Sequence, residues 1–168
     1  MYLIFDTETT GLPGNFKAPI TDIDNWPWCV QIAWQLHDKW GNLIEARDYL
    51  VKPDRFDIPS NASDIHGIST ALAEELGEEL DFVLNEFNLA LKKSEFVVGQ
   101  NVGFDINIMG CEFHRKGLDS PLAQISVLDT CTEETANLCQ IFIGKSKKPK
   151  FPSLTELHEH LFGVGFGD

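Results

Sequence analysis

The chain has 168 residues, the size of one ordinary domain, and 43% of them are hydrophobic, which excludes disorder as the default state. The balance of 26 acidic against 13 basic residues gives a formal net charge of -13. That charge argues against a protein that holds nucleic acid through a broad basic surface. A metal-dependent enzyme with clustered carboxylates remains compatible with it.

Targeting signals are missing from the sequence as it stands. No stretch reaches the roughly 18 apolar residues of a membrane span. The N-terminal residues lack the basic start and long apolar stretch of a signal peptide. The four cysteines include no C-x-x-C pair, which favours reduced thiols over a disulfide framework. We therefore expect a cytoplasmic protein with no membrane partner.

Runs of apolar residues and turn signals predict an alternation of strands and helices. Gly41-Asn42 marks a hairpin turn, so the two strands around it are expected to be antiparallel neighbours. Residues 54–70 read as a loop. In chain order, the expected elements are strands over 2–5, 28–37 and 43–51, a helix over 76–91, a strand over 96–99, a helix over 104–115, a strand over 125–128, a helix from 130 or 132 to about 142, and a helix that Ser153 caps.

This order predicts a single α/β domain over residues 1–168. A strand hairpin followed by strand-helix alternation implies a mixed sheet of five strands with helices on its faces. The ends of the first and fourth strands can then lie side by side, and such strand ends are where α/β sheets place their sites.

Asp6 and Glu8 are the first sign of chemistry. Alternate residues of a strand project to the same side, so both carboxylates point together. Two neighbouring carboxylates raise each other's pKa unless a cation lies between them, and charges beside an apolar strand need a partner or a metal. The pair is therefore a candidate divalent-metal site. The other acid pairs at this spacing, expected to be solvated, are Asp22/Asp24 in a polar loop and Glu79/Asp81 on an acidic helix.

Asp105 is the second sign. It stands just inside a helix start, where an acid is already favoured by the helix dipole. Its strand-turn-helix setting, however, places it at the end of the fourth expected strand. Asp105 is therefore expected to lie near Asp6 and Glu8.

Three strings carry a resemblance to a known family. They are D-T-E-T-T-G-L at residues 6–12, I-H-G-I at residues 65–68 and V-G-Q-N-V-G-F-D at residues 98–105. In this order and strand context the chain resembles the DEDD-type 3′–5′ exonucleases, and most of all the subclass of the proofreading epsilon subunit of bacterial DNA polymerase III. The resemblance runs from Met1 to about Phe162. It implies a ribonuclease H-like fold, which agrees with the element order.

The resemblance also implies hydrolysis of phosphodiesters assisted by two metal ions, Mg²⁺ or Mn²⁺. Asp6 would bridge both ions, Glu8 would bind the first, and Asp105 would help to hold the second, partly through water. One ion would lower the pKa of the attacking water and the other would stabilise the leaving 3′ oxygen.

By the same resemblance, five further residues would bind the 3′ end of single-stranded DNA or RNA. Thr9, Gly11 and Leu12 would contact the terminal nucleotide through backbone and apolar surface. His66 and Phe104 would line the pocket, although His66 has the simpler alternative of a histidine that caps a turn. A DNA polymerase subunit is a candidate partner.

The last expected helix departs from the family. The family carries H-x-x-x-x-D there, whose histidine is the general base and whose aspartate is the fourth metal ligand. His158 and His160 have glycines five residues on, and Asp168, ten residues after His158, is not expected to substitute. We interpret the domain as C-terminally incomplete, with its final helix missing, and expect weak or absent nuclease activity and weakened metal binding. Asp129 is interpreted as a strand-end acid.

Two other functions stay open at this point. One is a catalytically inactive, nuclease-like module that binds nucleic-acid ends or a protein partner. The other is a ribonuclease H-like enzyme that cuts an RNA–DNA hybrid internally, which the T-T-G-L and I-H-G-I strings disfavour. The only basic run, residues 145–150, is either a contact with the substrate backbone or a solvated loop.

Overall fold

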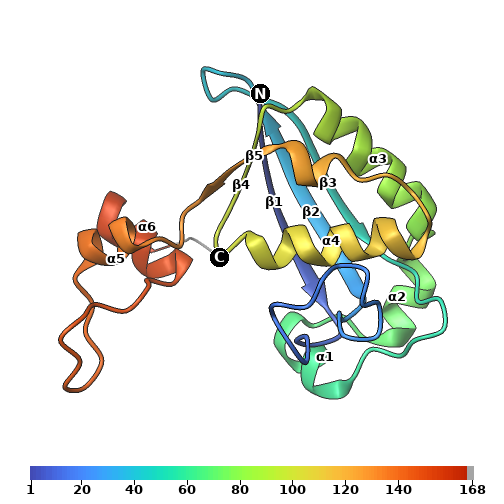
Figure 1. The fold of residues 1–168 in the computed structure, drawn as a ribbon, viewed down its shortest axis with the longest axis horizontal. Helices are drawn as coiled ribbons and strands as arrows, with labels where there is room; N and C mark the ends of the chain where they lie inside the picture. Colours follow the sequence, from blue (N-terminus) through green and yellow to red (C-terminus); the bar gives the residue numbers. More distant parts are fainter. Residues whose placement is uncertain (166–168) are drawn as a thin grey trace.

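The computed structural model describes residues 1–165, and a five-stranded sheet with the order β3-β2-β1-β4-β5 lies at its centre (Figure 1). Antiparallel pairing joins β1 to β2 and β2 to β3, and parallel pairing joins β1 to β4 and β4 to β5. The predicted mixed sheet is confirmed. The strands are β1 (Tyr2–Thr9), β2 (Cys29–His37), β3 (Leu43–Leu50), β4 (Phe96–Gly99) and β5 (Ser126–Asp129).

Helices α3 and α4 cover one face of the sheet, whereas α5 and α6 lie to one side of it, beyond β5 (Figure 1). No helix within residues 1–165 is both long and apolar enough to cross a membrane. A short 3₁₀ helix, Pro121–Gln124, precedes β5. The α-helices are α1 (Ser60–His66), α2 (Thr70–Leu76), α3 (Leu80–Lys93), α4 (Gly103–Arg115), α5 (Glu133–Cys139) and α6 (Leu154–Phe162).

The main core lies between the sheet and the helices α3 and α4. Every second residue of β1, starting with Leu3 and Phe5, points into it and is buried. The residues between them, such as Ile4, lie on the opposite face, which is exposed on β1 and β3. This asymmetry leaves one side of the central strands open. The buried apolar side chains on the α3 and α4 side include Val83, Leu84, Phe87, Leu91, Ile108, Met109 and Phe113.

The expected loop over residues 54–70 is wrong in its second half. It contains α1, which ends at Gly67 with a φ of 77°, and it leads into α2, which Ser69 caps by accepting a hydrogen bond from the Leu72 amide. Both helices have only seven residues and pack through a second small core around Val30. The helix expected from residue 76 therefore begins at Leu80, after α2 has ended.

The two C-terminal helices begin as their capping residues predict. Thr132 and Thr135 form a capping box at α5, and Ser153 and Glu156 form one at α6. Helix α5 ends at Cys139, three residues earlier than expected, because Gln140 adopts a left-handed conformation with a φ of 52°.

Candidate active site

Asp6 and Glu8 lie within β1, on the open face of the sheet. The sequence places them after the strand, and this is wrong, because the strand continues to Thr9. The buried neighbour Thr7 points to the opposite face, so the two carboxylates do share one side as predicted. Asp6 is exposed and Glu8 is half-buried. The two carboxylates are therefore only partly removed from water.

The two carboxylates influence each other's protonation. Partial burial raises the pKa of Asp6, and a hydrogen bond from the backbone of Thr7 counters it. The pKa of Glu8 is raised first by burial and then by the negative charge of Asp6, while His66 lowers it. Both groups thus lie where a positive charge would be favourable.

Asp105 lies in the first turn of α4 and is only 4% exposed. Its Oδ1 accepts two hydrogen bonds from Thr7, one from the amide nitrogen at 3.0 Å and one from Oγ1 at 2.6 Å. Burial raises the pKa of Asp105 to about 6, and the charge of Asp6 adds to this effect. As predicted, α4 brings Asp105 to the same strand that carries Asp6 and Glu8.

The donor set fits a divalent cation in part. Carboxylate oxygens are the ligands that Mg²⁺ and Mn²⁺ prefer, and Asp6 acts electrostatically on both other acids. Within residues 1–165, however, no three His, Cys, Asp or Glu side chains are grouped so that they could hold one ion. Asp105 is turned toward Thr7 instead. Asp6 and Glu8 are therefore the candidates for direct ligands, and Asp105 is a candidate for contact through water.

The turn between β4 and α4 fixes the position of Asp105. A Cβ at Gly99 would come within 2.9 Å of the Val102 side chain and 3.1 Å of the Phe5 carbonyl oxygen, so only glycine fits this crossing. Asn101 has a φ of 57°, and its amide donates to Asp129 Oδ1 at 2.8 Å. Asp129 also accepts from the Cys131 amide, as expected for a strand-end acid.

His66, the last residue of α1, has the turn-capping contact that was the simpler of its two expected roles. Its Nδ1 accepts a hydrogen bond from the Ile68 amide at 3.1 Å, which places the proton of the neutral ring on Nε2. This Nε2 is buried and has no hydrogen-bond partner among the described residues. The charge of His66 lowers the pKa of Glu8, so the ring lies near that carboxylate.

The T-T-G-L string forms the turn that leaves β1. Thr9 Oγ1 donates to the Gly11 carbonyl at 2.7 Å, and the Thr10 amide donates to the Trp28 carbonyl at 3.0 Å. Gly11 has a φ of 152°, a conformation that favours glycine. Leu12, directly after it, is 75% exposed, which leaves an apolar side chain in water beside the acidic strand.

Phe104 is half-buried and faces an aromatic partner that the sequence reasoning missed. Its ring centroid lies 6.4 Å from that of Phe16, which is 58% exposed in the loop between β1 and β2. A large apolar residue in a polar loop is the signal that could have identified Phe16.

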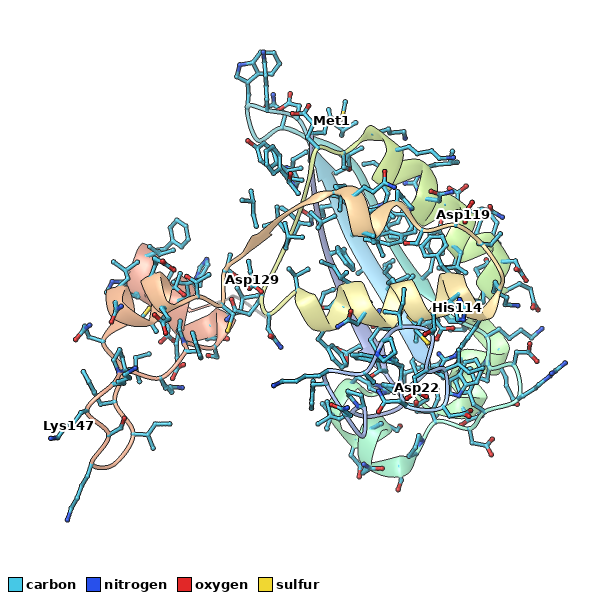
Figure 2. The ribbon with its side chains drawn as sticks, viewed as in Figure 1. Met1, Asp22, His114, Asp119, Asp129 and Lys147 are labelled. Atoms are coloured by element: carbon cyan, nitrogen blue, oxygen red, sulfur yellow. The ribbon has the colours of Figure 1, made fainter. Side chains whose placement is uncertain are left out.

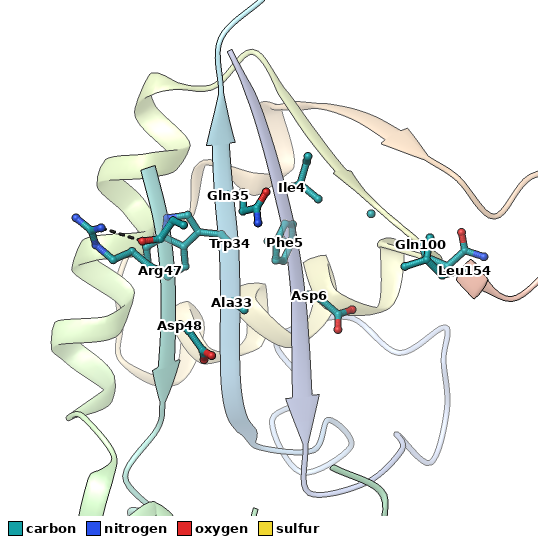
Figure 3. A pocket seen from close by; sticks show the side chains of 12 residues that line it. Ile4, Phe5, Asp6, Ala33, Trp34, Gln35, Arg47, Asp48, Gln100 and Leu154 are labelled. Atoms are coloured by element: carbon teal, nitrogen blue, oxygen red, sulfur yellow. Dashed lines mark hydrogen bonds between the residues drawn. The ribbon is translucent and has the colours of Figure 1, made fainter. Parts of the chain in front are cut away.

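Asp6 lines a cavity of about 650 Å³ on the open face of the sheet. Figure 3 shows Asp6 on β1 and Asp48 on β3 with Ala33 between them, while Gln100 and Leu154 close the far side. The strand register places these three β residues in one row. The cavity therefore runs from Asp6 across β2 to β3.

Buried charges hold the loop that follows Leu12, and sequence reasoning did not find them. Arg115 on α4 donates to the carbonyls of Ile23, Trp26 and Pro27, and its ion pair with Glu112 is buried. An arginine three residues after a glutamate on an otherwise apolar helix face was the available signal.

One H-x-x-x-x-D string does occur outside the last helix, from His114 to Asp119. Its His114 lies near the C-terminal end of α4, about 14 Å along the axis from Asp105 at roughly 1.5 Å per residue, and Asp119 lies beyond the helix. Figure 2 shows His114 near the end of α4 and Asp119 in the segment after it, both on the side of the molecule away from Asp129. The string is therefore not part of the carboxylate site.

Of the last-helix candidates, His158 Nδ1 lies 2.8 Å from the Val164 carbonyl oxygen, and Asp168 lies outside the described residues.

Comparison with solved structures shows the fold. E. coli exonuclease I in complex with a dT13 oligonucleotide superposes with a TM-score of 0.71 at 22% identity, covering 95% of this chain and 35% of that one. A product-bound exonuclease I gives 0.73 at 23% identity, with 99% and 39% covered. An ExoI/SSB-Ct complex gives 0.73 at 21%, with 99% and 37% covered. The chain thus spans little more than a third of those exonuclease I chains.

Comparison with curated proteins finds no match. The sequence model of the exonuclease family (RNase_T) matches residues 3–161. The match includes the carboxylate strand, the α1 histidine and the start of α4. The ribonuclease H-like fold of the sheet and helices agrees with it. The chain therefore belongs to the exonuclease family.

Proposed function

We propose that the chain hydrolyses phosphodiester bonds at the 3′ end of a single-stranded nucleic acid, with Asp6, Glu8 and Asp105 as its catalytic carboxylates. The observation that carries the proposal is that Asp105 accepts two hydrogen bonds from Thr7, the residue between Asp6 and Glu8 in the chain. Family membership supports a nuclease, and the three motif strings support the 3′–5′ direction.

Two divalent cations, Mg²⁺ or Mn²⁺, are proposed to bind these carboxylates, Asp6 to both. When bound, they would lower the pKa of the attacking water and stabilise the leaving oxygen. The chain's own contribution is to position the acids: β1 holds Asp6 and Glu8 on one face, and Thr7 fixes the orientation of Asp105.

The terminal nucleotide is proposed to lie between the T-T-G-L turn and α1. Thr9, Gly11 and Leu12 would present backbone and apolar surface to it, and Phe104 would contact the base. His66 Nε2–H, which has no hydrogen-bond partner within residues 1–165, would donate to an oxygen of the bound substrate. The 75% exposed Leu12 supports this arrangement, since a bound base would cover it.

We further propose the proofreading type of activity, as in the epsilon subunit of DNA polymerase III, with a polymerase subunit as the partner. This rests on the motif resemblance. A primer whose 3′ end is mismatched should be shortened faster than the same primer fully paired. Equal rates on both primers would argue against a proofreading role.

One observation favours the alternative, a nuclease-like module that binds nucleic-acid ends or a partner without cutting. The described residues hold no group of three metal-binding side chains. The two functions are separated by incubating a 5′-labelled single-stranded oligonucleotide with Mg²⁺. A ladder of labelled products that shorten one nucleotide at a time supports the 3′–5′ exonuclease, whereas binding without shortening supports the module.

A further inference from the structure

The segment that joins α5 to α6 concentrates positive charge in an acidic chain. It carries four lysines, and no acidic residue occurs between Thr135 and Thr155. Lys150 pairs with Glu156 at 2.7 Å. The other three lysines are exposed, and within residues 1–165 none of them lies within 4 Å of an acidic oxygen. We call residues 141–151 the basic loop.

Hydrogen bonds give the basic loop a defined shape. Its two ends are joined by the Lys150 amide, which donates to the Ile141 carbonyl at 2.7 Å. At its tip, Ser146 Oγ donates to the Lys148 carbonyl at 2.7 Å, and Gly144 supplies a φ of 58°. Figure 2 shows Lys147 extending from this loop, on the side away from the sheet.

A hollow of about 320 Å³ lies between the basic loop and α5. This volume is at the lower end of the range for ligand pockets, about 300–1,000 Å³. Phe151, which is 53% exposed, lies in its wall. An exposed ring beside unpaired lysines is the combination that binds single strands, because bases stack on the ring while the cations hold the phosphates. The lining residues are Glu133, Ala136, Asn137, Lys147, Lys148, Pro149 and Phe151.

The chain just after the basic loop contacts the cavity that Asp6 lines. Gln100, in the turn before α4, donates through Nε2 to the Pro152 carbonyl at 2.8 Å. Leu154, two residues further on, lines the same cavity as Asp6. A strand held by the basic loop could therefore continue past the start of α6 toward Asp6 on β1.

We propose that the basic loop and α5 form a second binding site for single-stranded nucleic acid, separate from the site for the 3′ end. Lys147 and Lys148 bind the phosphates and Phe151 stacks with a base. The further claim, that the carboxylates cut the strand bound here, rests on the proposed function. Binding of the strand is independent of the proposed function, because it needs neither a cation nor hydrolysis.

The test measures fluorescence anisotropy of labelled dT15 and rU15 with the full chain in EDTA, at several salt concentrations. Lys147→Ala/Lys148→Ala is compared with Lys39→Ala/Lys92→Ala, which removes two exposed charges elsewhere. Two lost phosphate contacts should reduce the slope of log K against log salt by about 1.4, since each contributes roughly 0.7 on single strands. Affinity should fall about tenfold, and Phe151→Leu should weaken binding with the slope unchanged.

Equal losses in the two double variants would overturn the proposal, because they would indicate general attraction to charge. So would an unchanged affinity in all variants, or lysine-dependent binding to anionic vesicles with none to either oligonucleotide. Release of mononucleotides from a trinucleotide too short to reach the loop is measured in parallel. Lysine-dependent binding without release of mononucleotides would contradict the proposed function and leave the second binding site standing. Release without lysine-dependent binding would contradict the second binding site and leave the proposed function standing.

Discussion

Thr7 and Asp105 are 98 positions apart, yet both donor groups of Thr7 bind one carboxylate oxygen of Asp105. Thr7→Val removes the hydroxyl and keeps the shape, so a buried carboxylate loses a hydrogen bond. We expect the free energy of unfolding to fall by about 1–3 kcal/mol and nuclease activity to fall with it. Urea unfolding measures the first effect, and Thr7→Ser, which retains the hydroxyl, should restore both properties.

Asp105 should make the protein less stable as the pH rises. Its pKa is about 6 in the folded chain against an ordinary value of 3.8, so the native state holds the proton more tightly than the unfolded state. This contribution is fully present below pH 3.8 and is lost as the pH passes about 6. At about 1.4 kcal/mol for each pKa unit, it amounts to at most about 3 kcal/mol.

Asp105→Asn tests that pH dependence. Asparagine keeps an oxygen that accepts from Thr7 but carries no charge, so in EDTA the variant should be more stable than the natural chain at pH 7.5 and equally stable near pH 4. Thermal unfolding across this range gives the comparison. A variant that is less stable than the natural chain at pH 7.5 would contradict the prediction, because it would show that the folded chain stabilises the ionised form of Asp105.

Cation binding should depend on Asp6 and not on acids in general. Asp6→Asn should weaken Mn²⁺ binding, measured by calorimetry, at least tenfold, because the pair with Glu8 is lost. Asp22→Asn is the matched control, since this acid lies in an exposed loop with the same i, i+2 spacing to Asp24. Identical Mn²⁺ affinities for the two variants would contradict the proposal that Asp6 is a metal ligand.

The Glu112–Arg115 pair should be the ion pair that matters most for stability. Arg115→Met leaves Glu112, 1% exposed, without its cation, and should lower the free energy of unfolding by about 3–5 kcal/mol. Lys116→Met breaks an adjacent pair with Asp81, whose side chain is 61% exposed, and should cost at most about 1 kcal/mol. Urea titration of both variants checks the difference, and equal losses would contradict it.

The sheet could be predicted from the sequence because four of its strands contain apolar runs, and the Gly41-Asn42 turn indicates the fifth, the more polar β3. The helices α1 and α2 could not be, since seven residues are too few to show a periodic pattern. Their stability comes from burying Ala62 and Ala73 against Val30 of β2. That contact depends on the tertiary structure and leaves no local signal.

The candidate site was predictable in its parts but not in its contacts. Strand alternation places Asp6 and Glu8 on one side whatever the rest of the chain does. The partner of Asp105 and the proximity of His66 to Glu8 depend on how α4 and α1 pack on β1. The first contact sets the orientation of Asp105, and the second places His66 where its charge lowers the pKa of Glu8.

The most direct measurement compares the shortening of a 5′-labelled single-stranded oligonucleotide by the natural chain, by Asp6→Asn and by Asp22→Asn, each with Mn²⁺ and with EDTA. Our account predicts stepwise shortening from the 3′ end, however slow, that needs the cation, survives Asp22→Asn and is lost in Asp6→Asn. Shortening at the same rate in Asp6→Asn, or none by the natural chain at any concentration, would contradict it.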